Sequence, residues 1–423
     1  MKKLKIGLAG LGTVGSGVYE ILKKDAAILS ARTQTQIEIV AVSSRSNKDF
    51  VDGKTKFYIN PIDLACDPEI DVIVEVMGGV LTAQELLRAA LKNGKKFVTA
   101  NKALIAEHGV EIAKLVEEYN GHIGFEASTA GANPVIKTFK ESFVAGEITE
   151  FYAILNGTCN FILTKMDEES LPFEQTLKEA QELGYAEADP TLDIKGIDTA
   201  HKLTILAAIS AATKPAFKQI YIEGIDQISL DDVKLAEQLG YKIKLLAIYK
   251  KLNQASQQTV YPALIKKTEK IAQVDGTFNA VLLKHSNANF NFSIGRGAGG
   301  LTTGFAIVAD LADIARDRTS NLFGVSFDKL SQANVIDISR RKGKYFLHLL
   351  LDKNLAQKGD LAQSIFGDEI EISQTAFIDK DEEILCGFLT NEQREENIVK
   401  LLKNLDSNLV KFAKFLRVEE TNF

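Results

Sequence analysis

The feature that most constrains the fold of this chain is a glycine motif near its N-terminus, Gly10-Leu11-Gly12-Thr13-Val14-Gly15. An apolar run, Lys5–Ala9, precedes the motif, and apolar residues recur at helical spacing after it. In the order strand, tight turn and helix, the pattern is typical of a dinucleotide site. Gly10 permits the turn, Gly12 admits a pyrophosphate to the backbone, and Gly15 lets the helix pack on the strand. We therefore predict that Gly10 to Gly15 bind a dinucleotide at the positive end of the helix.

Strands and helices alternate after this motif. We expect further strands at Ile37–Val42, Asp71–Met77, Lys96–Ala100 and His122–Ala127. The alternation predicts a doubly wound parallel sheet of the Rossmann type, in which ligands bind beyond the carboxyl ends of the strands. Lys102 follows one of those ends between two apolar runs, so we predict a functional role for it. An ordinary solvated lysine is the alternative.

The residues after the second strand bear on the choice of cofactor. An Asp or Glu usually follows this strand in an NAD site and binds the ribose hydroxyls. Here the chain has the sequence SSRS at positions 43–46. Arg45 is placed to face a 2′-phosphate, which favours NADP(H) and leaves NAD(H) as the alternative. A loop arginine without a ligand would have the same sequence.

A second glycine cluster, Gly295 to Gly300, precedes a long apolar helix from Thr302 to about Ala315. Its glycines, among them Gly297 and Gly299, can approach a cofactor closely. We expect this helix to return to the first domain.

A charged stretch from Tyr185 to Leu206 holds the side chains best suited to acid–base chemistry. Carboxylates at Glu187, Asp193 and Asp198 precede Lys202, and the pattern then turns helical, so Asp198 and Lys202 share one helix face. The helix is apolar nearly all round after Lys202, which predicts burial, and a buried lysine needs partners. We predict that carboxylates hold a polar substrate and that the lysine moves a proton. A surface helix with an ordinary salt bridge is the alternative.

Length and composition limit the class of protein. A chain of 423 residues should hold about two or three domains, and a net charge of −6 with mixed signs argues against a nucleic-acid partner. No apolar stretch is long enough to cross a bilayer, and we interpret the basic start as a first strand instead of a signal peptide. Cysteines at 66, 159 and 386 make no metal-ligand pair and indicate a reducing cytoplasm. We interpret Cys159 as a small buried residue, because no histidine lies near it in sequence.

The C-terminal part changes character. Residues 320–344 are interpreted as a linker with a basic stretch at Arg340–Lys344, and residues 345–423 follow the β-α-β-β-α-β order of a ferredoxin-like unit. A small appended unit of this type suggests ligand sensing, by analogy only.

Six segments make the chain resemble the homoserine dehydrogenase family from Gly7 to about Arg318. They are GLAGLGTVGSGV, VTANKALIA, FEASTAGANPVI, ILNGTCNFILTKM, ELGYAEADPTLDIKGIDTAHKL and GRGAGG, of which the fifth is long and specific. The resemblance implies reversible NADPH- or NADH-dependent reduction of L-aspartate 4-semialdehyde to L-homoserine, in the biosynthesis of threonine, methionine and isoleucine. It also implies a homodimer or homotetramer.

The resemblance assigns roles to individual residues of this chain. Lys202 matches the acid–base lysine, and Lys102 matches the lysine at the junction of cofactor and substrate. Glu187 and Asp198 match the substrate-binding acids of the family, and Asp193 matches another acid of the site. Gly184 matches a glycine that contacts the cofactor.

A monovalent cation, sodium or potassium, is also implied. The backbone that matches its site belongs to Glu126, Thr129, Gly131 and Asn133. From the residues alone, the small side chains of Ser128–Pro134 suggest carbonyls turned toward a cation or, equally, a tight turn. The loop departs from the family, since Thr129 stands where Val is common and Asn133 where a branched apolar residue is common.

The C-terminal unit resembles an ACT domain, which in many family members binds threonine and inhibits the enzyme. Residues Asn354 to Gly359 replace the usual glycine-containing turn, so the effector site is altered or lost. We expect a Rossmann domain at 1–134 completed by the helix near 301–318, an α+β catalytic and dimerisation domain at 135–320, and the ACT-like regulatory domain at 345–423.

Other functions fit the residues less well. Aspartate-semialdehyde dehydrogenase needs a catalytic cysteine with a histidine partner, and Cys159 has none evident in sequence. A catalytically inactive dinucleotide-binding amino-acid sensor is the second alternative, and the intact Lys102, Glu187, Asp198 and Lys202 argue against it. Because Met1 leads straight into the nucleotide motif, we expect a monofunctional enzyme without an aspartate kinase.

Overall fold

A computed structural model describes residues 1–353 and 361–421, and the chain divides into two compact units. The first unit consists of Met1–Glu150, His201–Gln219 and Asn279–Asn334. The second consists of Phe151–Ala200, Ile220–Phe278 and Val335–Phe423. The chain passes from one unit to the other within strand β7 (Ile148–Ile154), within helix α10 (Ile197–Ala211) and at three further points.

A parallel sheet of six strands forms the centre of the first unit, in the order β3-β2-β1-β4-β5-β6. Its strands are β1 (Lys2–Ala9), β2 (Thr35–Ser43), β3 (Lys56–Tyr58), β4 (Val72–Glu75), β5 (Lys96–Thr99) and β6 (Ile123–Gly124). The helices of this unit include α1 (Thr13–Lys24), α2 (Ala26–Thr33), α3 (Ile62–Cys66), α4 (Leu81–Lys92), α5 (Lys102–Glu118) and α12 (Gly300–Ala315). The strand order reverses between β1 and β4, which is the arrangement of a Rossmann-like dinucleotide-binding domain and confirms that part of the fold prediction.

Two predicted elements at the edge of this sheet are wrong in extent. The strand expected at 122–127 ends at Gly124, and Glu126 begins a 3₁₀ turn, Glu126–Ser128. The Glu126 carboxylate accepts the backbone N–H groups of Ile136 (2.9 Å) and Lys137 (2.8 Å), and this tertiary contact draws the chain out of the strand. The helix expected at 135–144 is α6 (Val135–Lys137) followed by a π-helical turn, Thr138–Ser142.

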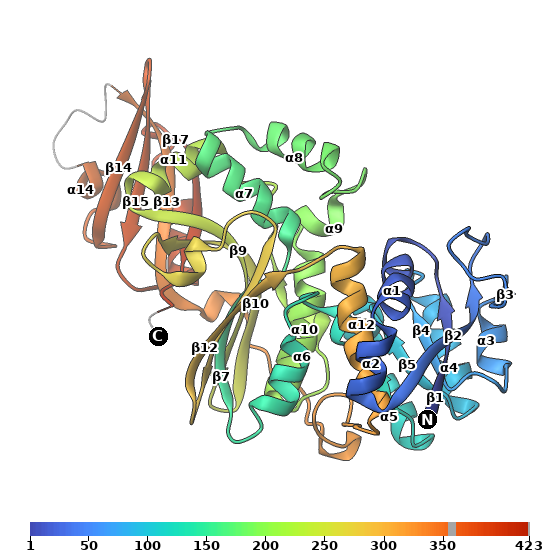
Figure 1. Cartoon of the computed structure of the whole chain (residues 1–423). Coiled ribbons are helices and arrows are strands. Elements are labelled where there is room, and N and C mark those ends of the chain that lie inside the picture. The colour runs from blue at the N-terminus through green and yellow to red at the C-terminus, as the bar shows by residue number, and fades with distance from the viewer. Residues whose placement is uncertain (354–360, 422–423) are drawn as a thin grey trace. The chain divides into compact units, whose positions relative to one another are not determined.

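Helix α12 packs on α1 backbone to backbone. A Cβ on Gly300 would lie 2.6 Å from the carbonyl oxygen of Thr13, and a Cβ on Gly17 would overlap the carbonyl oxygen of Gly300. Ile307 and Leu311 of α12 are fully buried in the same core as the strands β1 and β4. Figure 1 shows α12 in orange alongside α1 and α2 in blue. The hairpin β11 (Phe278–His285) and β12 (Asn289–Arg296) directly precedes this helix.

The second unit is built on a mixed sheet in which β9, β10, β17, β13, β15 and β14 are successive neighbours. These strands are β9 (Tyr241–Leu252), β10 (Ala255–Lys266), β13 (Lys342–Asp352), β14 (Ile372–Lys380), β15 (Glu383–Thr390) and β17 (Val410–Val418). Two short strands, β8 (Tyr221–Ile222) and β16 (Gln393–Arg394), pair with β10 and β13. The described helices of this unit include α7 (Gly157–Glu169), α8 (Phe173–Glu182), α9 (Thr191–Ile194), α11 (Leu230–Gln238), α14 (Leu361–Phe366) and α15 (Glu395–Lys403).

The C-terminal strands are part of this sheet. Strand β17 lies parallel to β10, with Ala263 opposite Arg417, and antiparallel to β13. Apart from the two-residue strand β16 between β15 and α15, the described elements β13, α14, β14, β15, α15 and β17 follow the predicted β-α-β-β-α-β succession. The predicted effector turn, residues 354–359, lies outside the described residues. Among the described residues, no helix is both long enough and apolar enough to span a bilayer.

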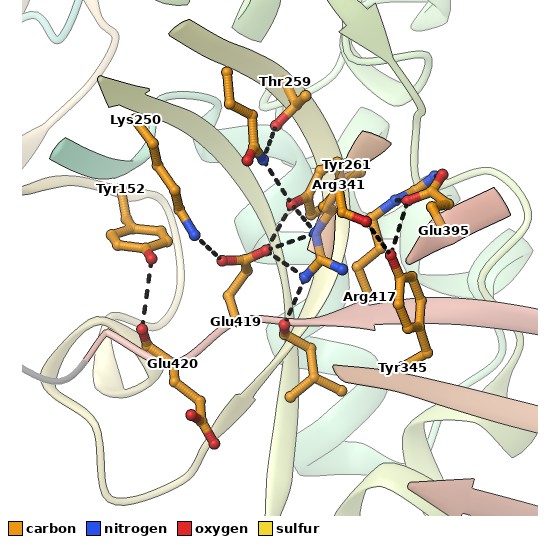
Figure 2. A network of polar contacts seen from close by, with 12 residues as sticks. Tyr152, Lys250, Thr259, Tyr261, Arg341, Tyr345, Glu395, Arg417, Glu419 and Glu420 are labelled. Atoms are coloured by element: carbon orange, nitrogen blue, oxygen red, sulfur yellow. Dashed lines mark hydrogen bonds and ion pairs between the residues drawn. The ribbon is translucent and has the colours of Figure 1, made fainter. Parts of the chain in front are cut away.

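The predicted basic linker, 320–344, differs from the structure at its end, because strand β13 already begins at Lys342 and the preceding Arg341 is buried. Arg341 is 4% exposed, because its guanidinium donates to the Glu419 carboxylate (2.7 Å) and to the Val418 carbonyl (2.8 Å). Tyr261 and Lys250 also donate to Glu419, at 2.6 and 2.8 Å (Figure 2). Burial by itself would raise the pKa of Glu419, but the charges of Lys250 and Arg341 outweigh it and hold that pKa at about 2. These contacts hold the end of the last strand, β17, against β9 and β10.

Candidate active site

The glycine motif lies where β1 ends and α1 begins, as a dinucleotide site requires. Gly10 has φ +108°, and a Cβ there would lie 2.6 Å from the carbonyl oxygen of Val76. A Cβ on Gly15 would overlap the carbonyl oxygen of Gly10, whereas one on Gly12 would meet nothing within 4 Å. Gly10 and Gly15 are therefore needed for the turn and the packing. Gly12, the residue before α1, leaves its backbone accessible to a phosphate.

The second glycine cluster lies beside the first. Gly300 contacts Thr13 through its backbone, and Gly299, at φ +125°, is the residue before α12. Gly297 lies against the Asn279 side chain, because a Cβ there would overlap the Asn279 amide. Both glycine-led helix starts thus belong to one region of the first unit. Arg45 follows β2 and is exposed.

Sequence reasoning missed a buried carboxylate at the end of β4. Glu75 is fully buried and accepts hydrogen bonds from Thr99 Oγ1 (2.6 Å) and from the backbone of Met77 (2.8 Å). Burial raises the pKa of Glu75. Its position at the carboxyl end of a central strand is the only sequence signal that could have identified it.

This carboxylate helps to place Lys102. Thr99 Oγ1 accepts the backbone N–H of Asn101 (2.9 Å), and Asn101 in turn caps α5 by accepting the backbone N–H of Leu104 (3.1 Å). Lys102 is the first residue of α5 and therefore lies at the carboxyl end of β5, where the sequence placed it.

The helices that carry the two predicted lysines are linked within the first unit. His201 Nε2 lies 2.9 Å from the Glu107 carboxylate of α5, and the imidazole stacks on Phe217 at 4.4 Å. Lys202 is the next residue on α10 and is 8% exposed. The predicted burial of this helix is confirmed, since Leu203, Ile205 and Leu206 are inaccessible.

In the second unit, the predicted acids fall into two groups. Asp193 lies on α9, Asp198 lies in the first turn of α10, and the side chain of Asn156 binds both carboxylates, at 2.7 and 2.9 Å. Glu187 is exposed, and Gln181 donates to its carbonyl oxygen (3.1 Å). Gly184 is also exposed, with φ +75°.

Asn156 is a further residue that sequence reasoning missed, although it lies within a segment of the family resemblance. The only local signal is its position before a glycine and a helix start, which is typical of a helix cap. Cys159, three residues later, is fully buried as predicted.

The predicted cation loop, Glu126 to Asn133, lies in the first unit against the end of β12. Gly131 has φ +57°, and a Cβ there would lie 2.7 Å from the carbonyl oxygens of Arg296 and Gly297. The buried side-chain atoms Ser128 Oγ, Thr129 Oγ1 and Asn133 Nδ2 have no hydrogen-bond partner among the described residues. Within residues 1–353 and 361–421, no group of three or more His, Cys, Asp or Glu side chains is arranged to hold a metal.

Comparison with known proteins identifies the family. Residues 134–312 match the family model of homoserine dehydrogenase, and residues 10–126 match that of the homoserine dehydrogenase NAD-binding domain. A homoserine dehydrogenase of Pseudomonas aeruginosa is 41% identical over 356 residues, which cover 82% of each chain.

Solved structures agree with this match. A homoserine dehydrogenase from Thiobacillus denitrificans has a TM-score of 0.91 at 38% identity, covering 99% of each chain. A hyperthermophilic archaeal homoserine dehydrogenase in complex with NADPH has a TM-score of 0.65 at 26% identity, covering 76% of this chain and 99% of the other. The chain therefore belongs to the homoserine dehydrogenase family, a family of oxidoreductases.

Proposed function

We propose that this protein catalyses the reversible reduction of L-aspartate 4-semialdehyde to L-homoserine, with NADP(H) preferred over NAD(H). Beyond family membership, the observation that carries the proposal is the acid–lysine arrangement on α10. Asp198 lies one turn before the buried Lys202, and Asn156 joins Asp198 to Asp193. Such an arrangement suits an amino-acid substrate that carries both an ammonium group and a reactive carbonyl.

Lys202 and Lys102 are the proposed catalytic residues. A bound nicotinamide nucleotide supplies the hydride for the aldehyde carbon. As negative charge grows on the carbonyl oxygen, the Lys202 ammonium stabilises the oxygen and then protonates it. In the reverse direction, Lys202 accepts the hydroxyl proton of homoserine. The substrate-binding acids are Glu187, Asp193 and Asp198, with Glu187 assigned to the α-ammonium group.

The cofactor would be held by the two glycine-led helix starts of the first unit. The proposed contacts are Gly10, Leu11, Gly12, Thr13, Val14, Gly15, Arg45, Lys102, Gly184, Gly297 and Gly299. Two observations support NADP(H). Exposed Arg45 follows β2 in a segment without an acid, and an archaeal relative has been solved in complex with NADPH.

A monovalent cation, Na⁺ or K⁺, is proposed at the backbone carbonyls of Glu126, Thr129, Gly131 and Asn133. The loop is buried, and the hydroxyl oxygens of Ser128 and Thr129 lack a hydrogen-bond partner among the described residues, which fits a site that contains a polar occupant. The replacements at Thr129 and Asn133 are compatible with backbone ligation. Bound there, the cation would stabilise the loop against the end of β12.

Regulation and assembly complete the proposal. Residues 1–134 with the helix near 301–318 would bind the nucleotide, residues 135–320 would carry catalysis and dimerisation, and residues 345–423 would form an ACT-like regulatory domain, for which L-threonine is the candidate effector. The enzyme would act as a cytoplasmic homodimer or homotetramer in threonine, methionine and isoleucine biosynthesis. Three free cysteines support a reducing compartment.

The absorbance of NADPH at 340 nm, followed with L-aspartate 4-semialdehyde in sodium or potassium buffer, tests the reaction. We expect rapid oxidation that yields homoserine, slower oxidation with NADH, and inhibition by L-threonine if residues 345–423 form a working effector site. Folded protein that oxidises neither cofactor would overturn the proposed activity. Equal rates with both cofactors would remove the role of Arg45.

A further inference from the structure

Residues at the start of α7 form several hydrogen bonds to the segment that carries the predicted acids, residues 185–198. Asn156 is the N-cap of this helix, and its Oδ1 accepts the backbone N–H of Cys159 (2.8 Å). Its Nδ2 donates one hydrogen bond to Asp193 Oδ1 (2.7 Å) and another to Asp198 Oδ2 (2.9 Å). The side chain is 5% exposed, so the amide uses its acceptor and both donors in a buried setting.

Neighbouring residues fix the backbone of the same segment. Thr158 Oγ1 donates to the carbonyl oxygen of Tyr185 (2.6 Å), and Cys159 Sγ donates to that of Asp193 (3.2 Å). On the other side of α9, the backbone N–H of Ile225 donates to the carbonyl oxygen of Ile194 (2.8 Å). The backbone around Asp193 is thus held from two sides, and the Asn156 amide joins the Asp193 carboxylate to that of Asp198.

The chemistry of an amide suits this position. Two carboxylates that share a neighbour repel one another, and repulsion favours uptake of a proton by one of them. Two N–H donors favour the ionised form of both acids without adding a positive charge to the site. A lysine or arginine at 156 would neutralise the acids, and an aspartate would add a third negative charge.

We propose that Asn156 is a positioning residue that keeps Asp193 and Asp198 ionised and oriented toward the amino-acid substrate. The inference rests on the proposed function, since it assumes that these acids serve homoserine and aspartate semialdehyde. Asn156 touches no reacting atom in this role. It acts through the two carboxylates while also capping α7.

The variant Asn156→Asp separates the two tasks of this residue. Asp retains the capping oxygen at nearly the same volume and loses the amide donors. At low pH the introduced carboxyl is protonated and can still donate one hydrogen bond, whereas at high pH it is ionised and repels both acids. We expect the KM for L-homoserine to rise about tenfold at pH 8.5, and the ratio of variant to wild-type KM to shrink as the pH is lowered toward 6. The NADPH dissociation constant, measured by fluorescence, should change less than about twofold.

Two further variants keep the test decisive. Asn156→Ser retains a cap and cannot bridge both acids, so it should raise the KM without the pH-dependent rescue, even if Asn156→Asp fails to fold. Ser229→Ala removes the capping box of α11, where Ser229 bonds Asp232, and should lower the melting temperature with an unchanged KM. A KM for homoserine that stays within twofold of wild type in both Asn156 variants would overturn the inference. A wild-type protein that does not oxidise homoserine would instead overturn the proposed function.

Discussion

At the scale of single residues, Lys202 is the sharpest test of the proposed chemistry. Replacing it with Ala removes the group that protonates the alkoxide, so kcat should fall about 10²- to 10⁴-fold with a smaller change in KM. Lys202→Arg keeps a positive charge but cannot readily release a proton, so it should restore little of the rate. Initial rates with NADPH and aspartate semialdehyde measure both effects. The exposed Lys218 on the segment after α10 provides the control, because Lys218→Ala should leave kcat unchanged. A Lys202→Ala enzyme with near-normal turnover would remove Lys202 from its assigned role.

Site residues could be identified from sequence where their contacts are local, and were missed where their partners lie far away in the chain. Lys202 and Asp198 are four positions apart on an apolar helix, so their shared face and burial follow from periodicity. Asn156 binds acids that are 37 and 42 positions away, and no local pattern reports that contact. Glu75 depends likewise on Thr99, 24 positions away on the neighbouring strand. Partners of this kind are set by the tertiary fold.

At the scale of elements, the direct contact of α1 with α12 predicts a strict limit on side-chain size. Gly17→Ala improves the intrinsic helix propensity by about 1 kcal/mol, but its Cβ would overlap the backbone carbonyl of Gly300, which no rotamer change can relieve. Overpacking costs of about 3 kcal/mol exceed that gain, so we expect the free energy of unfolding to fall by about 2 kcal/mol and NADPH binding to weaken. Urea unfolding and nucleotide titration measure the two effects. Gly53→Ala, at an exposed position with nothing within 4 Å, should be nearly neutral. If Gly17→Ala and Gly53→Ala were equally stable, α1 and α12 would be able to move apart without a loss in the free energy of unfolding.

Helices and strands could be predicted from sequence where their residues are continuously buried. The predictions failed where a side-chain contact changes the course of the backbone. The four residues of β4 are all buried, and its apolar run was evident in sequence. The strand expected at 122–127 stopped at Gly124 because the Glu126 carboxylate binds the start of α6. The short β3 and α3 were missed, since three and five residues give too little periodicity to detect.

At the scale of the whole molecule, the C-terminal strands cannot be treated as a detachable attachment. Strand β17 pairs with β10, and Arg417 donates to both Glu395 (2.8 Å) and Tyr221 (3.1 Å). A chain that ends before residue 345 would lose β17 and leave Tyr261 and Lys250 without Glu419. Loss of a threonine response after such a truncation would therefore not distinguish regulation from unfolding, and point substitutions near the effector turn are the better test.

The buried cluster around Glu419 predicts how the stability of this molecule depends on pH. The pKa of Glu419 is lowered from 4.5 to about 2, so its stabilising contribution is complete above pH 4.5 and is lost as the pH falls toward 2. By linkage the contribution is on the order of 3 kcal/mol. In Glu419→Gln, the free energy of unfolding should be lower at neutral pH by a similar amount, because Lys250 and Arg341 lose a buried counter-charge.

The same variant should change less than the wild type between pH 4.5 and 2. Urea midpoints measured at pH 7, 5, 4 and 3 test both parts of this prediction. Glu392, which pairs with Lys342 where both side chains are more than half exposed, is the matched control. Its pKa is also lowered, by that lysine, but Glu392→Gln should shift stability by less than about 1 kcal/mol. If the stability of Glu419→Gln instead fell with pH in parallel with that of the wild type, the acid sensitivity would have to come from other carboxylates. Glu419 would then contribute only packing between the last strand and the rest of the sheet.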